Sequence, residues 1–570
     1  MDVDIALRVA FATGVLLHVS LFRIGEWDIW ATKLMRAPFI LLAALSAALT
    51  WLRPAEPILL SFSYACQLDA ALLGGILVSM LVYRAFFHRL RSFPGPFAAR
   101  LSSLYMTSQA ALKKMQPCHE LKRLHEQYGE FVRIGPMELS ITEPAAFRDI
   151  YANSSPCEKG PLYSHGYPSE TVLEVRSRKQ HGPKRKPWDY AFTTQALNDY
   201  EDRVGRYTDQ LLGRIEESKG AAFNITRWFS FYTFDVMGEL AFGKSFRQLE
   251  DNVEHYMSRV AHEAQRMIGG VFIYQPWFMA TFRTTPVLNW GWLKLQSWSN
   301  EQIRNRLSNE PKVPDIFHWI SSEYRRNPRP TPLDKLSLQA EIRLIVIAGS
   351  DTTAMTLTGL FYHLVKAPKV VARLRDEIDG LAAQGDQALT KNASLAKLRY
   401  LQACIDESLR LLPVVPTRLQ RMTPPRELRL VAAGSLAILL SSRPRGSCAE
   451  VSNKSHITPI TTEIPSVIDS RCFARPDEFV PERWTTEPDL VLDASVYAPF
   501  SVGRSSCAGK QLALIELRRT VALIVHRYDF ALAPDQRIEA FESGLEDHFT
   551  LNPPEFKLVF KPRDALSRTG

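Results

Sequence analysis

One cysteine of this chain stands among residue types that suit a metal-binding thiolate. Cys507 lies in the stretch FSVGRSSCAG, residues 500–509, and the apolar stretch 512–525 that follows predicts a helix. Gly503 and Gly509 have the backbone freedom that a tight loop needs. The N–H groups at the start of a helix stabilise the negative charge of a thiolate. A lone cysteine is more often a small buried apolar residue, so the interpretation depends on the spacing around it.

This loop resembles the haem loop of the cytochrome P450 family, F-x-x-G-x-x-x-C-x-G, at its four fixed positions: Phe500, Gly503, Cys507 and Gly509. The resemblance implies a haem b whose iron takes the thiolate as its axial ligand, which favours O–O cleavage. Phe500 would form an apolar wall beside the ring. One position departs from the family pattern. The arginine that usually stands two residues before the cysteine, to pair with a haem propionate, is replaced by a serine, and Arg504 stands one position earlier.

A second set of residues suits proton transfer. Residues 336–365 predict one long helix, which contains the stretch AGSDTT, residues 348–353. The hydroxyl of Thr352 can donate to the carbonyl of Ala348, four residues back, and open the helix locally. The alternative is a polar patch in a buried helix. The stretch resembles the family's oxygen-activation motif at every position, which implies that Asp351 and Thr352 relay protons and favours a monooxygenase over an isomerase.

A third set of residues suits a structural charge network. Glu407 and Arg410 are three residues apart in a predicted helix, residues 401–412, and therefore face each other. This spacing alone is not specific. Together with Arg483, in the stretch FVPERW, it resembles the family's Glu-Arg-Arg network. Buried charges are tolerated only when they are fully hydrogen-bonded, so we expect these three residues to hold the cysteine loop in place.

His181 and Arg185 have the i, i+4 spacing of the family's propionate-binding helix. The resemblance implies that they bind the haem, and the stretch RKPWD, residues 185–189, resembles fungal members. The alternative is a solvated basic face that attracts an acidic redox partner, and both interpretations can hold together.

The elements that must position these residues are mostly helical. Periodicity predicts helices at residues 191–212, 228–240 and 370–381, strands at 132–134 and 139–141, and a terminal strand pair at 549–560. The resemblance implies the cytochrome P450 fold, mainly α with small β-sheets, preceded here by N-terminal transmembrane helices. Residues 156–178 are expected to shape the substrate pocket.

The amino-terminal region predicts a membrane anchor. The apolar stretches Ile5–Phe22, Ala37–Leu52 and Phe62–Tyr83 are close to the roughly 20 residues that span a bilayer. Any one of them could instead be a buried core helix. We therefore expect an anchor at residues 1–90, with one to three transmembrane helices, and a haem-thiolate monooxygenase domain at residues 91–570.

The charges that flank these stretches predict their orientation. Basic residues lie between the first two stretches and after the third: Arg23, Lys33, Arg36, Arg84, Arg89 and Arg91. The positive-inside rule places the amino terminus in the lumen and the catalytic domain in the cytosol, at the endoplasmic reticulum membrane. The acidic start, MDVD, disfavours a cleaved signal peptide.

Composition limits the partners. The 570 residues carry a net charge of +9, but the positive charge is dispersed, so nucleic-acid binding is not expected. The chain has no GxGxxG or P-loop motif and thus no obvious flavin or nicotinamide site. Electrons are expected from NADPH through NADPH-cytochrome P450 reductase, docking near Lys510, Arg518 and Arg519, with cytochrome b5 as a further partner. The expected substrate is a lipophilic small molecule.

One segment does not follow the family pattern. Residues 425–470 show no clear period, and the interval between Glu407 and Arg483 is longer than usual for the family. Our hypothesis is that part of this segment is a translated intron or a frame error, which a spliced message encoding it intact would rule out. The resemblance to fungal members implies a monooxygenase of fungal secondary-metabolite biosynthesis. The alternative is a non-catalytic or misassembled membrane haem protein.

Overall fold

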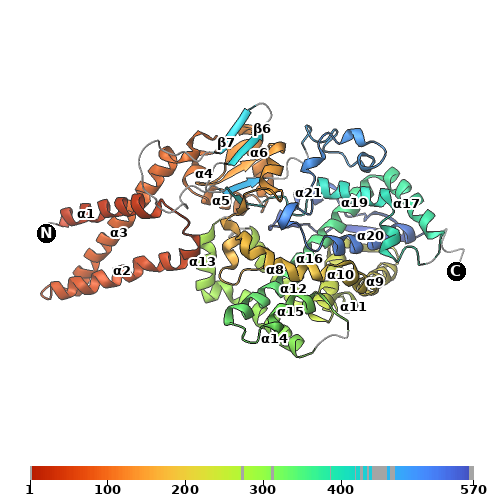
Figure 1. Ribbon diagram of the computed structural model, residues 1–570, viewed down its shortest axis with the longest axis horizontal. Helices are drawn as coiled ribbons and strands as arrows, with labels where there is room; N and C mark the ends of the chain where they lie inside the picture. Colours follow the sequence, from red (N-terminus) through yellow and green to blue (C-terminus); the bar gives the residue numbers. More distant parts are fainter. Residues whose placement is uncertain are drawn as a thin grey trace.

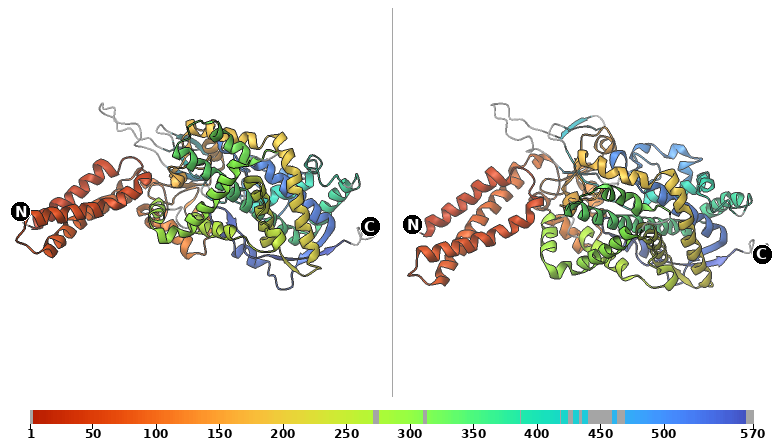
Figure 2. Two further views of the ribbon diagram at one scale, coloured as in Figure 1. Left: turned by 90° about the horizontal axis from the view of Figure 1, so that it is seen from below. Right: turned by 60° about the horizontal axis from the view of Figure 1, so that its bottom comes forward.

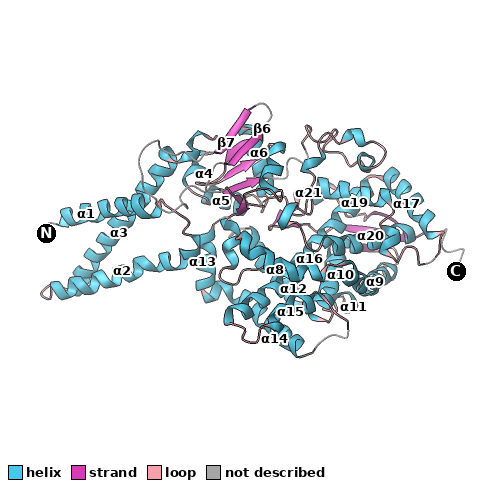
Figure 3. Cartoon of the chain, viewed as in Figure 1, coloured by secondary structure: helices cyan, strands magenta, loops and turns pink. Residues whose placement is uncertain are grey.

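Three long helices precede a mainly helical body in the computed structural model (Figure 1). The structure describes residues 3–270, 275–309, 313–385, 387–417, 419–423, 428–432, 435–439, 459–462 and 469–563. Strands are few and form small sheets beside the helices (Figure 3). The expected fold class, mainly α with small β-sheets, is confirmed.

The α-helices are α1 (Val3–Leu17), α2 (Ala31–Leu52), α3 (Ile58–Val82), α4 (Phe97–Leu101), α5 (Leu104–Leu112), α6 (Pro117–Tyr128), α7 (Pro144–Tyr151), α8 (Arg178–Ala191), α9 (Thr194–Glu217), α10 (Ile225–Phe242), α11 (Gln248–Asp251), α12 (Tyr256–Gly270), α13 (Pro276–Thr284), α14 (Pro286–Ser308), α15 (Ile316–Arg326), α16 (Pro332–Lys366), α17 (Pro368–Ala382), α18 (Asn392–Leu395), α19 (Arg399–Leu411), α20 (Lys510–Arg527) and α21 (Glu539–Ser543).

The strands are β1 (Phe131–Arg133), β2 (Leu139–Ile141), β3 (Glu158–Lys159), β4 (Ala222–Asn224), β5 (Arg421–Met422), β6 (Leu428–Ala432), β7 (Ser435–Leu439), β8 (Pro459–Thr462), β9 (Tyr528–Leu532), β10 (Glu546–Asp547), β11 (Leu551–Asn552) and β12 (Lys557–Pro562). The largest sheet has the order β1-β2-β8-β5-β3, and a second has the order β4-β12-β9. The pairs β6–β7 and β10–β11 are separate.

Most of the predicted elements are present. The antiparallel pair β1–β2 and the helices α9, α10, α16, α17, α19 and α20 lie where periodicity predicted them. The predicted terminal strand pair at residues 549–560 is wrong, because β11 pairs with β10 whereas β12 lies between β4 and β9. The tail therefore joins two sheets and does not fold back on itself.

Parts of the atypical segment 425–470 form strands although its sequence shows no clear period. β6 and β7 form an antiparallel pair. β8 lies parallel to β2 and antiparallel to β5 in the largest sheet. The remaining residues of the segment lie outside the described ones, apart from the two at its end. Residues 459–462 thus fit the body of the fold.

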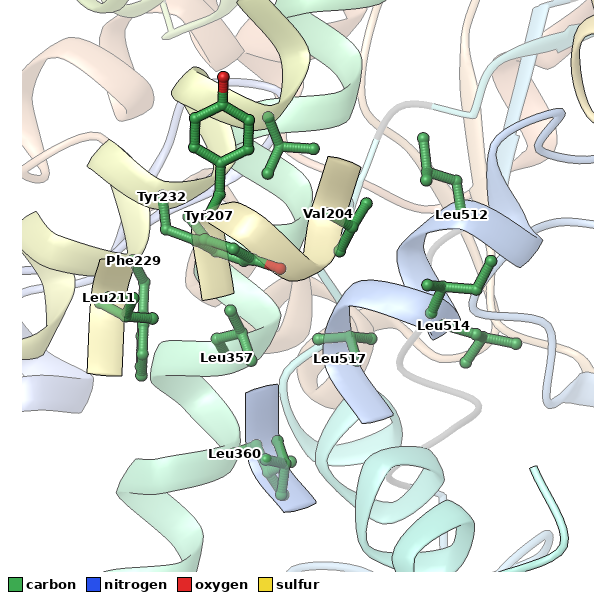
Figure 4. Packing of buried hydrophobic residues seen from close by; sticks show 14 of the residues in the cluster. Val204, Tyr207, Leu211, Phe229, Tyr232, Leu357, Leu360, Leu512, Leu514 and Leu517 are labelled. Atoms are coloured by element: carbon green, nitrogen blue, oxygen red, sulfur yellow. The ribbon is translucent and has the colours of Figure 1, made fainter. Parts of the chain in front are cut away.

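The core lies where α9, α10, α16 and α20 meet (Figure 4). Each helix contributes buried apolar side chains: Val204 and Leu211 from α9, Phe229 from α10, Leu357 and Leu360 from α16, and Leu514 and Leu517 from α20. Burial of such side chains contributes roughly 1.5–3 kcal/mol each relative to exposure. This packing fixes α16, which carries the acid–alcohol pair, against α20, which follows Cys507.

The three N-terminal helices project from one end of the body (Figure 1, Figure 2). Together with the short π-helical or 3₁₀ turns that adjoin them, they cover Val3–Phe22, Asp28–Leu52 and Ile58–Phe87. Each is long and apolar enough to cross a membrane. α16 also meets these criteria, but most of it is buried in the body. α1 and α3 run towards the body and α2 runs away from it (Figure 2).

Glycine lets α1 and α3 approach closely. A Cβ atom on Gly75 would lie 2.1 Å from the carbonyl oxygen of Phe11, and one on Gly14 would lie 2.1 Å from that of Leu72. By contrast, a Cβ atom on Gly74 would meet only the Phe11 ring, at 4.0 Å. Small residues commonly allow helices to pack in this way inside membranes.

The loop between α1 and α2 contacts the body. Both carboxylate oxygens of Glu26 accept hydrogen bonds from the Arg176 guanidinium, at 2.7 and 3.0 Å. Arg176 also donates to the carbonyl of Lys159 at 2.9 Å. α13 packs against α2 on the same side. The first interhelical loop therefore lies at the body end of the helix bundle, and the turn at residues 53–57 lies at the far end (Figure 1).

We predict that Gly75→Leu separates α1 from α3, because the new side chain would overlap the Phe11 backbone. Gly74→Leu is the matched control, since its Cβ position is open. Overpacking of this kind costs about 1–3 kcal/mol. The measurement is cross-linking by a short bis-maleimide between cysteines introduced at His18 and Ser79, whose side chains are 2.8 Å apart. Equal cross-linking in the two glycine variants would contradict this account of the packing.

Candidate active site

The Cys507 loop is a tight turn that leads directly into α20. The Cys507 N–H donates to the carbonyl of Phe500 at 2.8 Å, which closes the loop. Gly503 has a φ of +70°, and a Cβ atom there would lie 2.5 Å from the carbonyl oxygen of Tyr151. Gly503 is therefore required by both conformation and space. Gly509 has an ordinary φ of −81° and directly precedes α20.

The surroundings of the Cys507 thiol influence its charge in opposite directions. Burial raises its pKa, whereas the N–H groups of Gly509 and Lys510 and the charges of Arg185 and Lys510 act to lower it. Cys507 is nevertheless exposed to solvent. A cationic centre placed against the sulfur would favour the thiolate further.

The predicted Glu-Arg-Arg network is present and completely buried. Glu407 accepts hydrogen bonds from Arg410, Arg483, the Val480 N–H and the Trp484 indole, each at 2.9 Å. The side chains of Glu407, Arg410 and Arg483 have no exposed area. The two guanidinium groups use their other N–H groups on backbone carbonyls of residues 474–478 and 490. The Glu407 carboxylate thus holds both guanidinium groups and the backbone at Val480 in place.

This network continues into the segment before Cys507. The Trp484 ring lies 4.5 Å from the Tyr497 ring, between centroids. The Tyr497 hydroxyl donates to the Asp406 carboxylate at 3.0 Å, on the same helix as Glu407. Tyr497 stands three residues before Phe500, where the cysteine loop begins. The network therefore fixes the approach of the loop to α19.

The acid–alcohol stretch of α16 has the predicted local geometry. The Thr352 hydroxyl donates to the Ala348 carbonyl at 2.7 Å. Gly349 allows the thioether of Met237, on α10, to lie against the helix, because a Cβ atom would meet its sulfur at 2.6 Å. Ala348 is exposed and Thr352 half-buried, one turn apart. A small molecule could therefore approach the helix at this turn.

Asp351 has a partner that the sequence analysis did not identify. His262, on α12, places its Nε2 atom 3.0 Å from the Asp351 carboxylate. Neither spacing nor a motif links residues 89 positions apart, so only the fold brings them together.

A group of basic residues lines one pocket beside the cysteine loop: Lys159, Arg176, Arg178, His181, Arg421 and Arg504, with Glu158 as the one carboxylate. Arg504 donates through Nη2 to the carbonyls of Ser155 and Cys157, at 2.7 and 3.0 Å. Its Nη1 atom is buried and has no hydrogen-bond partner among the described residues. This excess of positive charge suits an anion such as a carboxylate.

The structure separates the roles of His181 and Arg185. His181 lines the basic pocket, and burial together with the charge of Lys159 lowers its pKa to about 4. Arg185 instead turns to the cysteine loop, where it donates to the Ser506 carbonyl at 2.5 Å. His181 therefore contributes to the basic pocket beside the cysteine loop, whereas Arg185 binds the loop itself.

The loop at residues 156–178 is held by buried charged groups. Glu341 of α16 accepts from the Val172 N–H at 2.7 Å and from the Trp188 indole at 3.1 Å. Burial raises the pKa of Glu341 to about 7. Lys159 donates to the carbonyls of Val172 and Leu173 at 2.9 and 2.8 Å. The loop that is expected to shape the pocket is thus fixed against the long helix.

One of the three predicted docking cations, Arg519, is wrong. Arg519 is buried and donates to the Thr390 carbonyl at 2.8 Å. Arg518 donates to the side chains of Gln402 and Asn392. Arg519 lies on the packed face of α20, Arg518 is half-buried, and Lys510, at the start of that helix, is exposed.

A haem group fits these residues. It needs a thiolate, an apolar wall and cations for two propionates. These needs are met by the exposed Cys507, by the half-buried Phe500 and by the buried Nη1 atom of Arg504, which no described residue pairs. His181 would lie on the propionate side, and Gly503 and Gly509 would shape the loop under the ring.

The chain resembles known proteins over nearly its full length. The family model described as Cytochrome P450 matches residues 98–426 and 463–560. Cytochrome P450 monooxygenase FCK2 of Fusarium pseudograminearum is 40% identical over 558 residues, which cover 97% of each chain. Tryprostatin B 6-hydroxylase of Aspergillus fumigatus is 32% identical, with 98% of this chain and 96% of the relative covered.

A solved structure supports the same fold. The chain described as the crystal structure of cytochrome P450DA heme domain superposes with a TM-score of 0.63 at 18% identity. The superposition covers 80% of this chain and 95% of that one. At this identity the similarity concerns the fold alone.

We predict that Glu407→Gln lowers the free energy of unfolding by about 3–5 kcal/mol, because it leaves two buried guanidinium groups without a counter-charge. The matched control is Glu478→Gln, which removes the exposed ion pair with Arg475 and should leave stability unchanged. Chemical denaturation of the detergent-solubilised protein provides the measurement. A similar loss in both variants would show that the buried network does not have the role assigned to it.

Proposed function

The chain belongs to the cytochrome P450 family, and from this premise we propose a membrane-anchored monooxygenase of fungal secondary-metabolite biosynthesis. It takes electrons from NADPH through a separate reductase and oxidises a lipophilic small molecule. The observation that carries the proposal is the Cys507 thiol at the start of α20, packed in one body with the acid–alcohol pair of α16.

The reaction balances as substrate-H + O2 + NADPH + H⁺ → substrate-OH + H2O + NADP⁺. The Cys507 thiolate would hold the haem iron, and haem, when bound, would supply oxygen activation. Arg504 and His181, which line one pocket, would hold its propionates. Arg185 fixes the loop through the Ser506 carbonyl. The N–H groups of Gly509 and Lys510 support the thiolate charge.

Proton transfer belongs to Asp351 and Thr352. The Thr352 hydroxyl donates to the Ala348 carbonyl and so points its oxygen along the exposed turn of α16. In this position its oxygen can accept a hydrogen bond from a water or a reacting group. Asp351, the neighbouring residue, would supply the next proton to that water or to Thr352. Groups in such roles typically contribute about 10²–10⁴-fold to a rate.

Electrons would enter on the Cys507 side of the body. Lys510 is exposed there, as is Lys186 on α8, whose neighbour Arg185 touches the cysteine loop. An acidic surface on NADPH-cytochrome P450 reductase would complement these charges, and cytochrome b5 could use the same face. No described part of the chain offers a nucleotide-binding motif of its own.

The substrate class is proposed from the relatives and from the pocket. A relative named as a tryprostatin B 6-hydroxylase aligns with 98% of this chain, which supports hydroxylation of a natural product. The loop at residues 156–178 is bonded to Glu341 of α16, the helix that also carries the acid–alcohol turn. Glu341 also accepts a hydrogen bond from Trp188 of α8. We propose that this loop determines which lipophilic molecule fits.

The anchor is proposed to place the body on the cytosolic face of the endoplasmic reticulum. Basic residues gather at the body end of the helices: Arg23, Lys33, Arg36, Arg84, Arg89 and Arg91. The contact of Glu26 with Arg176 keeps the first loop on the same side as the body. This distribution agrees with the positive-inside rule, with three spans and a lumenal amino terminus.

The atypical segment supports the alternative proposal of a misassembled protein. The family model leaves residues 427–462 unmatched. On the other hand, residues 459–462 form β8 in the largest sheet. A translated intron would therefore lie between β7 and β8, and the body on both sides of it would still follow the family pattern.

We predict that membranes containing the chain and a reductase incorporate ¹⁸O from ¹⁸O2 into a member of a terpenoid, polyketide and alkaloid panel. Asp351→Asn and Thr352→Val should each reduce the rate by about 10²-fold or more, because they remove proton transfer. Lys179→Gln, at an exposed position of α8, is the control. Labelled product at an unchanged rate in both site variants would contradict their assigned roles.

A second prediction concerns orientation. In sealed microsomes, a membrane-impermeant maleimide should label Ile24→Cys without permeabilisation, since residue 24 is exposed in the loop that contacts the body. It should label Ala55→Cys, in the far turn, only after permeabilisation. The reverse pattern would place the body in the lumen.

A further inference from the structure

His262 connects the acid of α16 to a second carboxylate. Its Nε2 atom lies 3.0 Å from Asp351 Oδ1, and its Nδ1 atom lies 3.5 Å from Glu254 Oε1. The edge of its ring meets the Phe234 ring of α10, at 5.2 Å between centroids. The three side chains thus form a row from the segment before α12 to the middle of α16.

Asp351 is less exposed than its two partners in this row. The Asp351 side chain is 15% exposed, whereas those of His262 and Glu254 are 35% and 32% exposed. Glu254 also accepts from Arg259 at 3.1 Å. The charged groups that face His262 are therefore Asp351 from α16 and Glu254 from the segment before α12, with Arg259 behind the latter and the apolar Phe234 from α10.

The two carboxylates control the charge of His262. Burial lowers its pKa, but Asp351 and Glu254 outweigh burial and raise the pKa to about 10. The imidazolium is thus present at neutral pH beside Asp351. Because such coupling is reciprocal, the pKa of His262 must fall once Asp351 is protonated. When Asp351 has given its proton to the site and is ionised again, the imidazolium can donate a proton to it along the 3.0 Å contact. The neutral imidazole that remains can then take up another proton on the side of Glu254.

The reaction requires such a supply. Each turnover reduces one oxygen atom to water and therefore consumes two protons with the two electrons of NADPH. Thr352 and Asp351 can pass protons on, but a largely buried Asp351 must be reprotonated between turnovers.

We propose that Glu254, His262 and Asp351 form the proton-entry route of this site, with His262 as the residue that reprotonates Asp351. The inference rests on the proposed function, because it extends the role of Asp351. It depends on a histidine of α12 that reaches across to α16.

A purely structural role makes a different prediction. If the pair only held α12 against α16, removing the imidazole would loosen the pocket and weaken substrate binding. The handling of oxygen and protons would then stay unchanged. The two roles can thus be separated by measurements that do not depend on substrate affinity.

The first experiment is NMR of the full-length, reduced and CO-bound enzyme labelled with [¹³Cε1]-histidine, in detergent. The His262 resonance is the one that His262→Gln removes. We expect this resonance to titrate far above pH 6.5. The titration midpoint should fall by more than about one pH unit in Asp351→Asn. Titration near 6.5, unaffected by Asp351→Asn, would overturn the proposal whatever the turnover shows.

The second experiment follows NADPH and oxygen consumption with reductase and no added substrate. Reduction of O2 to peroxide uses one NADPH per O2, whereas reduction to water uses two and requires more protons at the site. We expect His262→Gln to raise the peroxide share several-fold and to change the solvent isotope effect. His255→Asn is the matched control, because it keeps an acceptor for the Met257 N–H and does not touch Asp351.

An unchanged peroxide share and isotope effect in His262→Gln would overturn the relay. Absence of NADPH-dependent oxygen consumption in the wild type, with the shifted titration present, would instead contradict the proposed function and leave the ion pair established.

Discussion

The buried carboxylate of Glu407 is the constraint on which the catalytic end of the molecule depends. It accepts five hydrogen bonds, from two arginines, an indole and a backbone N–H. A charge without solvent is stable only when such partners are complete. Because Arg483 and Trp484 come from a segment far along the chain, the carboxylate fixes that segment to α19. Through Tyr497 it also fixes the start of the Cys507 loop. The position of the thiol is therefore a consequence of one ion network.

Residues with fixed spacing could be predicted from the sequence. The Cys507 loop, the Thr352 turn and the Glu407 network are local motifs or depend on helix periodicity, and the structure has the predicted local geometry. Partners that only the fold brings together could not be predicted. His262 and Arg421 belong to no motif, and each meets its site from a distant element. The inward orientation of Arg519 and the partners of β12 were mispredicted for a similar reason, since both depend on long-range packing.

The anchor and the body form a connected structure. Glu26 pairs with Arg176, and Arg176 lines the basic pocket beside His181 and Arg504. The first interhelical loop therefore lies next to the proposed propionate side. Removal of the anchor would leave Arg176 without its carboxylate and add positive charge to a pocket that already has an excess. This contact gives a physical reason to study the full chain and not the body alone.

The central claim is that Cys507 supplies a thiolate to haem iron. The most direct measurement is the difference spectrum of reduced membranes with and without CO, for the wild type and Cys507→Ala at equal expression. The account predicts a strongly red-shifted Soret band in the wild type that is absent from the variant. A wild type that is well expressed and binds haem but lacks this band, or a variant that retains it, would contradict the assignment of Cys507 as the ligand.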